Sequence, residues 1–133
     1  MKFEYILSNT KQLKQMINSN DRLHYHKQAK ITKQLKYLAK ADIRPEDKDS
    51  FSESCPCQVV VTVFSPTKRH LDPPNFYPTV KALIDGYTEG GLWKDDNYKI
   101  IQRLSFEYGG LSGIKGKYRI EVEIEKTEVK NND

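Results

Sequence analysis

Two stretches of the sequence alternate between apolar and polar residues, and this period of two constrains the fold more than any other feature. Apolar side chains occupy most of the alternate positions of residues 98–108, and residues 118–124 repeat the pattern. Successive side chains of a strand point to opposite faces of a sheet. The alternation therefore predicts two strands with one wet face, and residues 3–7 predict a shorter strand in the same way.

A short run in the middle of the chain predicts a strand of another kind. Residues 59–64 (VVVTVF) are nearly all apolar, and most of them are β-branched. Side chains of this type favour strands, and an unbroken apolar run is typical of a strand that is covered on both sides. We therefore expect this strand to be buried on both faces.

Two segments have the period of a helix. Residues 28–41 combine an apolar stripe with a lysine-rich opposite face. The stripe consists of Ile31, Leu35 and Leu38, and the opposite face carries Lys33, Lys36 and Lys40. A second helix is predicted to have Pro78 in its first turn and to end at Gly90-Gly91. Its expected buried stripe is Val80, Leu83, Ile84 and Tyr87.

The predicted elements follow one another in the order β-α-β-α-β-β, with no repeat and no linker between them. A chain of 133 residues is close to the usual size of one domain. We therefore predict one α+β domain with a mixed β-sheet and two α-helices. We assign residues 1–126 to this domain and residues 127–133 to a flexible C-terminal tail.

Charge is distributed unevenly along the chain. The formal net charge is +4, but residues 1–44 hold ten Lys or Arg and only three acidic residues. Residues 45–58 hold four acidic residues and one Lys. Lysines clustered on one element are typical of a protein that binds a phosphate backbone, although a solvated helix face has the same composition.

Hydropathy and cysteine spacing bear on the compartment. No apolar run approaches the roughly 20 residues that a transmembrane helix needs, so we expect no membrane partner. Cys55 and Cys57 lie too close together for an ordinary disulfide. This spacing favours a reducing cytoplasm.

Acidic residues and one lysine between positions 68 and 97 are candidates for a metal site. They are Asp72, Lys81, Asp85, Asp95 and Asp96. Mg²⁺ prefers carboxylate oxygens and keeps several waters, and a nearby lysine can neutralise a phosphate. The alternative is an exposed ion pair between Lys81 and Asp85, which are one helical turn apart.

The same segment, residues 69–100 (RHLDPPNFYPTVKALIDGYTEGGLWKDDNYKI), resembles the RusA family of Holliday-junction resolvases. The residues that match the family pattern are Asp72, Asn75, Lys81, Asp85, Trp93, Asp95 and Asp96. The N-terminal stretch NDRLHYHKQAKITKQLKYLA is similar to a family segment through Asn20, Arg22, Leu23 and His24. Together the resemblance covers roughly residues 18–125.

The resemblance implies a RusA-like fold and a Mg²⁺-dependent, homodimeric endonuclease, with Mn²⁺ as a substitute cation. Such an enzyme resolves Holliday junctions or other branched DNA by paired nicks during phage recombination and repair, in the cytoplasm of a bacterial host. The implied catalytic residues are Asp72, Lys81 and Asp96, and the implied metal ligands are Asp72, Asp85, Asp95 and Asp96. The expected DNA contacts are Asn20, Arg22, His24, Lys27, Lys30, Lys33, Lys36, Lys40, Lys68, Arg69 and Asn75.

The sequence departs from the family pattern at two points. The pattern has two acids spaced two apart before the Asn, whereas this chain has Asp72 followed by Pro74. The spacing from Asn75 to Lys81 is also three residues longer. These departures leave two alternatives open: a branched-DNA-binding protein without catalysis, and a protein-interaction module whose charges serve solubility. We expect Trp93 to anchor the core or a dimer interface.

Overall fold

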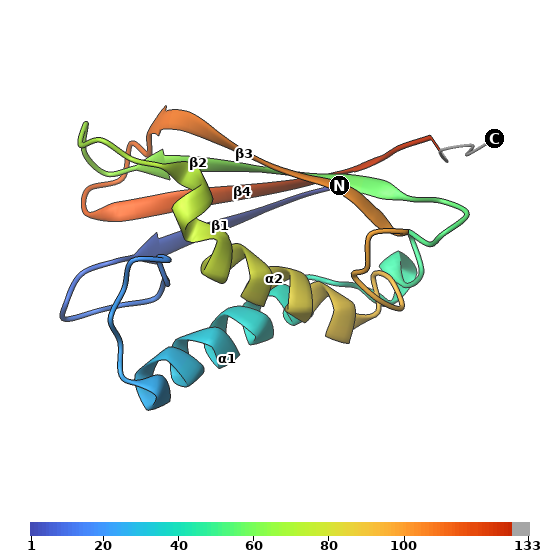
Figure 1. Cartoon of the computed structure of the whole chain (residues 1–133), viewed down its shortest axis with the longest axis horizontal. Helices are drawn as coiled ribbons and strands as arrows, with labels where there is room; N and C mark the ends of the chain where they lie inside the picture. The colour runs from blue at the N-terminus through green and yellow to red at the C-terminus, as the bar shows by residue number, and fades with distance from the viewer. Residues whose placement is uncertain (129–133) are drawn as a thin grey trace.

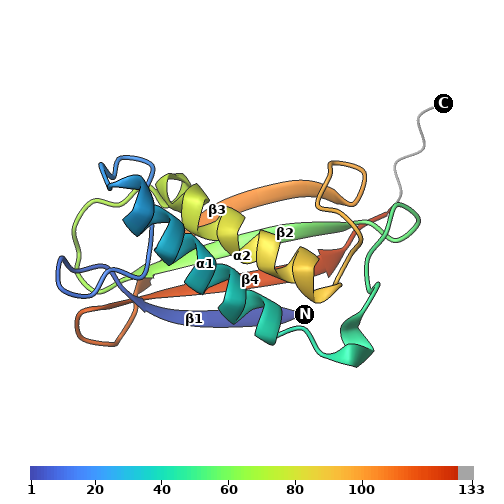
Figure 2. The ribbon, with the colours of Figure 1, turned by 90° about the horizontal axis from the view of Figure 1, so that it is seen from below.

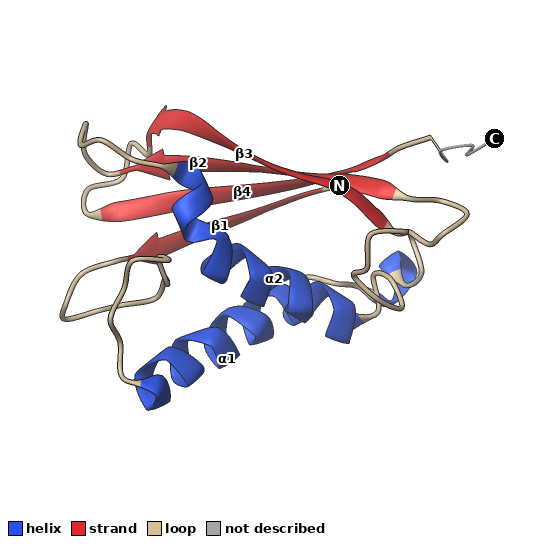
Figure 3. Cartoon of the chain, viewed as in Figure 1, coloured by secondary structure: helices blue, strands red, loops and turns tan. Residues whose placement is uncertain are grey.

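Four strands form one mixed sheet, and two α-helices cover one of its faces (Figures 1 and 2). This computed structural model describes residues 1–128. In chain order the elements are β1 (Lys2–Ser8), α1 (Tyr25–Ala41), a 3-10 turn η1 (Pro45–Asp47), β2 (Cys57–Ser65), a 3-10 turn η2 (Pro73–Phe76), α2 (Tyr77–Gly90), β3 (Ile101–Leu111) and β4 (Lys117–Lys126). The predicted order and the α+β class are confirmed (Figure 3).

The strands lie in the order β1-β4-β2-β3 across the sheet. β2 pairs with β3 in parallel, and β4 pairs with both β1 and β2 in antiparallel fashion. A parallel pair needs a crossover that returns the chain to the starting edge, and α2 forms this crossover between β2 and β3. The two loops that flank α2 therefore leave from opposite ends of the sheet.

Burial alternates along β2, so the expectation that this strand is covered on both faces is wrong. Val59, Val61 and Val63 are fully buried beneath the helices. The residues between them, such as Val60 and Phe64, are only half-buried. Both α-helices lie on the same side, and no helix of residues 1–128 covers the other side.

The predicted helix over residues 28–41 begins three residues earlier, at Tyr25. Ile31 and Leu35 are buried as expected, but the third buried residue is Ala39. Leu38 is 42% exposed, so its assignment to the core stripe is wrong. The reason is the angle at which α1 meets α2, because the small side chain at position 39 lies at the contact between the helices.

The second helix agrees with the prediction. Its four expected core residues are buried, and its Pro lies in the first turn. Gly91 follows the last turn in the left-handed conformation, with φ 90°. Its backbone N–H donates to the carbonyls of Thr88 and Tyr87, which is the hydrogen bonding that a glycine C-cap provides.

Gly86 allows the two helices to approach each other closely. A Cβ atom at this position would lie 2.4 Å from the backbone oxygen of Lys36 and 2.6 Å from Cβ of Ala39. Because the first of these atoms belongs to the backbone, a side-chain rotation cannot relieve the overlap. Glycine is therefore required for this crossing of α1 and α2.

A buried hydroxyl pair ties the helices to the edge strand β1. The Tyr5 hydroxyl donates to Asp42 Oδ2 at 2.7 Å and lies 2.9 Å from the Tyr87 hydroxyl. Burial raises the pKa of both tyrosines. The two hydroxyls therefore stay protonated and join β1, α2 and the end of α1.

The last two strands begin and end slightly away from their predicted bounds. β3 starts at Ile101, because the backbone N–H groups of Ile100 and Ile101 both donate to the carbonyl of Asn97 in a turn. Tyr98 precedes the strand and is 78% exposed. After β4, Thr127 N donates to the carbonyl of Pro56 at 2.9 Å. The rest of the predicted tail, residues 129–133, lies outside the described residues.

Replacing Gly86 with Ala tests the helix contact. The added methyl group overlaps the backbone of α1, so Gly86→Ala is expected to lower the free energy of unfolding by about 1–3 kcal/mol. Urea unfolding followed by circular dichroism measures it. A glycine-to-alanine change in an uncrowded helix has the opposite sign and stabilises by about 0.5–1 kcal/mol. A more stable variant therefore contradicts the close approach.

Candidate functional site

Three of the predicted site residues meet on the exposed side of α2. The ammonium of Lys81 lies 2.7 Å from Asp85 Oδ1 and 2.6 Å from Asp96 Oδ2. Lys81 and Asp85 are one helical turn apart, whereas Asp96 comes from the loop that follows the helix. The group thus holds one positive charge between two carboxylates, and we call it the Asp85–Lys81–Asp96 cluster.

The loop that carries Asp96 is anchored by its apolar residues. Trp93 is 1% exposed, and its indole N–H donates to Thr88 Oγ1 at 2.6 Å. Leu92 is fully buried, and its backbone N–H donates to the carbonyl of Tyr87. These contacts hold the loop against α2, so that Asp96 faces Lys81. The expectation that Trp93 is a core residue is confirmed.

The cluster is partly exposed, and within it Lys81 and Asp96 shift each other's pKa. Partial burial lowers the pKa of Lys81, but the hydrogen bonds to Asp85 and Asp96 outweigh burial and raise it above the ordinary lysine value. Partial burial likewise raises the pKa of Asp96, but the hydrogen bond from Lys81 leaves it lowered. At neutral pH Lys81 is therefore an ammonium, which can donate to a phosphate oxygen but cannot accept a proton.

The Asp95 carboxylate, unlike that of Asp96, does not bind Lys81. One of its carboxylate oxygens accepts from the backbone N–H of Asp96 at 2.8 Å, and the other accepts from the Asn97 side chain at 3.1 Å. Both contacts are local and belong to the turn before β3. Asp95 also lines a hollow with Phe51 and Lys94. Among residues 1–128 its only hydrogen bond with the Asp85–Lys81–Asp96 cluster is the one from the Asp96 backbone, and it forms no ion pair with Lys81.

Asp72 lies in the loop before α2, whereas Asp96 lies in the loop after it (Figure 1). Its carboxylate is exposed and lies 3.3 Å from Nε2 of His70. The structure therefore does not bring Asp72 into hydrogen-bonding contact with the cluster. The parallel pairing of β2 and β3 is the cause, because it makes α2 a crossover whose flanking loops leave from opposite ends of the sheet.

These positions decide which residues suit a Mg²⁺ ion. Within residues 1–128 no three His, Cys, Asp or Glu side chains lie close enough together to hold a metal ion. Asp85 and Asp96 form a donor set of two carboxylates, and Mg²⁺ commonly takes only one or two carboxylates and completes its shell with water and phosphate. Asp85 and Asp96 alone therefore suit the ion chemically. The predicted set of four acids, which also includes Asp72 and Asp95, is not brought together.

The N-terminal candidates are held beside the loop before α2. The backbone N–H of Ser19 donates to the carbonyl of Asn75 at 2.7 Å. Two residues earlier, Ile17 exchanges hydrogen bonds with the buried hydroxyl of Thr79. The segment of Asn20, Arg22 and His24 is therefore attached to the start of α2, near Asn75. No sequence pattern indicates these contacts, because the paired residues are separated by 56 and by 62 residues along the chain.

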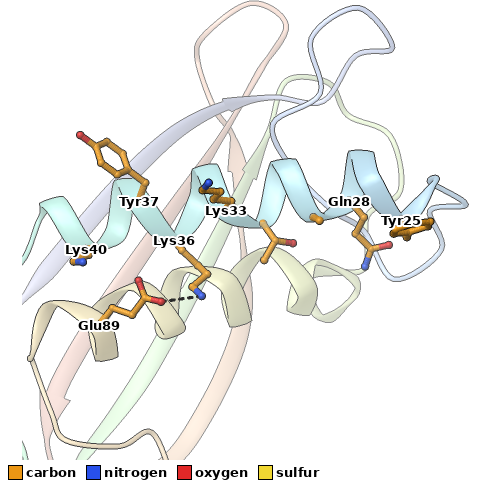
Figure 4. Close-up of a pocket in the computed structure, with 9 residues that line it drawn as sticks. Tyr25, Gln28, Lys33, Lys36, Tyr37, Lys40 and Glu89 are labelled. Carbon is orange, nitrogen blue, oxygen red and sulfur yellow. Dashed lines mark ion pairs between the residues drawn. The ribbon is translucent and has the colours of Figure 1, made fainter.

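The lysines of α1 divide between two sides of the helix. Lys33, Lys36 and Lys40 line a groove along α1 that reaches Glu89 of α2 (Figure 4). Lys27 and Lys30 are exposed outside this groove, and Lys68 and Arg69 are exposed in the loop after β2. Lys36 pairs with Glu89 at 2.9 Å, which raises the pKa of Lys36 and lowers that of Glu89.

Sequence reasoning missed two tyrosines that lie beside these lysines. Tyr25 and Tyr37 line the same groove and are 69% and 72% exposed. Their spacing could have indicated this exposure, because neither tyrosine falls on the buried stripe of Ile31 and Leu35. The partner of Lys36, Glu89, carried no such signal because it belongs to another helix.

Comparisons with known proteins add no assignment. No protein-family model matches the sequence, and no curated protein matches it significantly. Among residues 1–128, no helix combines the length and the apolar character required to span a bilayer.

The ion pair predicts a pH-dependent contribution of Asp96 to stability. Because folding lowers the pKa of Asp96 from its ordinary 3.8, the contribution is present above that pH and is lost as the pH falls through the folded-state pKa. For a partly exposed pair, Asp96→Asn should cost about 0.5–1 kcal/mol at pH 7 and almost nothing at pH 2.

Urea unfolding of the wild type and of Asp96→Asn at both pH values measures this difference. Glu46→Gln is the control, because Glu46 is exposed and forms no ion pair within residues 1–128. An equal destabilisation by Asp96→Asn at pH 7 and pH 2 contradicts the ion pair.

Proposed function

We propose that the protein is a Mg²⁺-dependent, structure-selective endonuclease that resolves Holliday junctions or other branched DNA by paired nicks. The observation that carries the proposal is the Asp85–Lys81–Asp96 cluster, in which two carboxylates and an ammonium converge from α2 and the following loop. The resemblance of residues 69–100 to the RusA family supports the same chemistry. The lysines of α1 supply the charge that a DNA backbone requires.

The chain's own residues have distinct tasks in this proposal. Lys81 is an ammonium at neutral pH, so it donates to an oxygen of the scissile phosphate and stabilises charge that develops there. Asp85 and Asp96 hold Lys81 in place and are the carboxylates available to the cation. When bound, a Mg²⁺ ion supplies Lewis-acid charge and a water of lowered pKa. Asp72, the other implied catalytic acid, lies beside Asn75 and outside the cluster, so it takes no part in the chemistry of this proposal.

The assembly and setting follow from the resemblance. Paired nicks on opposite strands require two active sites, and a two-fold homodimer supplies them. The cytoplasm of a bacterial host, during phage recombination and repair, is the corresponding setting. The predicted DNA contacts, from Asn20 to Asn75, belong to this proposal.

A second candidate is a branched-DNA-binding protein without catalysis. The position of Asp72 favours it, since this carboxylate pairs with His70 instead of joining the cluster. Pro74 also occupies the position where the family pattern has a second acid. This candidate keeps the basic surface of α1 and uses the Asp85–Lys81–Asp96 cluster only as an ion pair.

Cleavage of a synthetic four-way junction tests the catalytic proposal. The wild type is expected to nick it symmetrically with Mg²⁺ or Mn²⁺ and to lose this activity with EDTA. Lys81→Met and Asp96→Asn should each lower the nicking rate by about 100-fold or more, because each removes charge that stabilises the transition state. Glu46→Gln, an exposed acid outside the cluster, is the control and should keep full activity.

Two outcomes separate the candidates. Tight junction binding without nicks, with either cation, supports the non-catalytic protein. Nicking that survives Lys81→Met contradicts the assignment of the cluster. Asp72→Asn, measured beside them, should leave the nicking rate at saturating DNA unchanged and should not weaken junction binding, because it removes a negative charge.

The salt dependence of binding tests the basic surface. Lys33 and Lys40 have no ion pair with a carboxylate of residues 1–128, so each is free to bind a phosphate. Replacing either with Ala should reduce the slope of log K against log salt by about one. Fluorescence anisotropy between about 50 and 300 mM salt measures the slope. An unchanged slope in both variants contradicts the DNA contact.

A further inference from the structure

The groove along α1 combines unpaired positive charge with exposed aromatic rings. It has a volume of about 800 Å³ and is bounded by Tyr25, Tyr37, Lys33, Lys40 and the Lys36–Glu89 pair. Figure 4 shows Tyr25 near one end of α1 and Tyr37 toward the other, with Lys33 between them. The lining therefore combines cations and phenol rings, with the smaller Gln28, Ala29 and Thr32 between them.

The charge of the groove selects an anionic partner. Glu89 is the acidic residue that lines it, and Lys36 already neutralises this carboxylate at 2.9 Å. α1 itself carries no acidic residue over its 17 positions. Lys33 and Lys40 are thus left uncompensated, and a polyanion is the complementary partner.

The tyrosines narrow the choice among polyanions. Both residues are largely exposed to solvent, Tyr25 to 69% and Tyr37 to 72%. Within residues 1–128, neither tyrosine hydroxyl forms a hydrogen bond that would hold the side chain in this exposed position. At the start of the helix Tyr25 already stacks with His24 at a ring distance of 4.8 Å, and the His26 ring lies tilted beside it at 4.0 Å. Such rings offer flat faces to other flat groups.

The spacing of the rings suits a run of nucleotides. Tyr25 and Tyr37 are separated by 12 positions, which corresponds to a rise of about 18 Å along a helix axis. A stacked strand advances by about 3.4 Å per nucleotide, so the rings span about five nucleotides. The bases of duplex DNA are stacked inside the helix, and only unpaired bases can reach such rings.

We propose that this groove binds an unpaired segment of a DNA strand, with bases stacked on Tyr25 and Tyr37 and phosphates paired with Lys33 and Lys40. The inference deepens the proposed function and rests on it for the choice of DNA as the partner. It assigns α1 the task of recognising open bases beside a branch point. The lysines supply charge that any DNA meets, and the tyrosines supply the preference for an unpaired strand.

Binding of a labelled ten-nucleotide thymidine strand and of a ten-base-pair duplex, measured by fluorescence anisotropy, tests the inference. Tyr25→Ala and Tyr37→Ala should each weaken binding of the single strand about 5-fold or more and leave duplex binding unchanged. The Phe variants at both positions should bind like the wild type, because a phenyl ring also stacks. Lys33→Ala should weaken binding of both DNA forms.

The control is Tyr98→Ala, which removes a tyrosine of similar exposure (78%) that does not line the groove. It should bind the single strand like the wild type. All of these residues are exposed, so loss of folding does not confuse the result; circular dichroism of each variant verifies this.

Three results overturn the inference. They are tyrosine variants that bind the single strand normally, variants that lose both DNA forms equally, and competition by a poly-glutamate peptide that is as strong as competition by DNA. The last result identifies a protein partner instead. Nicking takes no part in this measurement, so a protein that fails to nick but shows the tyrosine effect refutes the catalytic proposal alone.

Discussion

The close contact between α1 and α2 at Gly86 determines how the side chains of the two helices meet. A Cβ atom there would lie 2.4 Å from the Lys36 carbonyl oxygen, so the helices meet through backbone and the small Ala39. The crossing brings Lys36 to Glu89, whereas the ammonium groups of Lys33 and Lys40 form no ion pair within residues 1–128. The groove with its two tyrosines is a consequence of this contact, because a wider separation of the helices would remove Glu89 from the reach of Lys36.

The parallel pairing of β2 with β3 determines where the candidate catalytic residues lie. It makes α2 a crossover, and so the loops with Asp72 and Asp96 start from opposite ends of the sheet. The long side chain of Lys81 partly bridges this separation by reaching Asp96. Asp72 remains with His70 and with the N-terminal segment that hydrogen-bonds to Asn75. The charged cluster and the Asp72–Asn75 end are therefore two separate regions around α2.

Much of the fold was predictable because local patterns reflect local physics. Alternation located the strands, and the period of α2 identified its four buried residues and the glycine that ends it. The errors at Leu38 and in β2 have a common origin. Periodicity shows which side chains share a face, but it does not show what covers that face. At Leu38 the covering helix crosses nearer to Ala39, and for β2 one face has no helix above it.

The sequence by itself determined the order of elements, the single α+β domain and the basic character of α1, because these depend on residue types and their spacing along the chain. It also selected Lys81 and Asp85, which one helical turn brings together. Only the tertiary structure decided that Asp96 joins this pair, that Asp72 does not, and that Glu89 neutralises one lysine of α1. Each of these contacts joins side chains of different elements, and the strand pairing and the helix crossing set their separation in space.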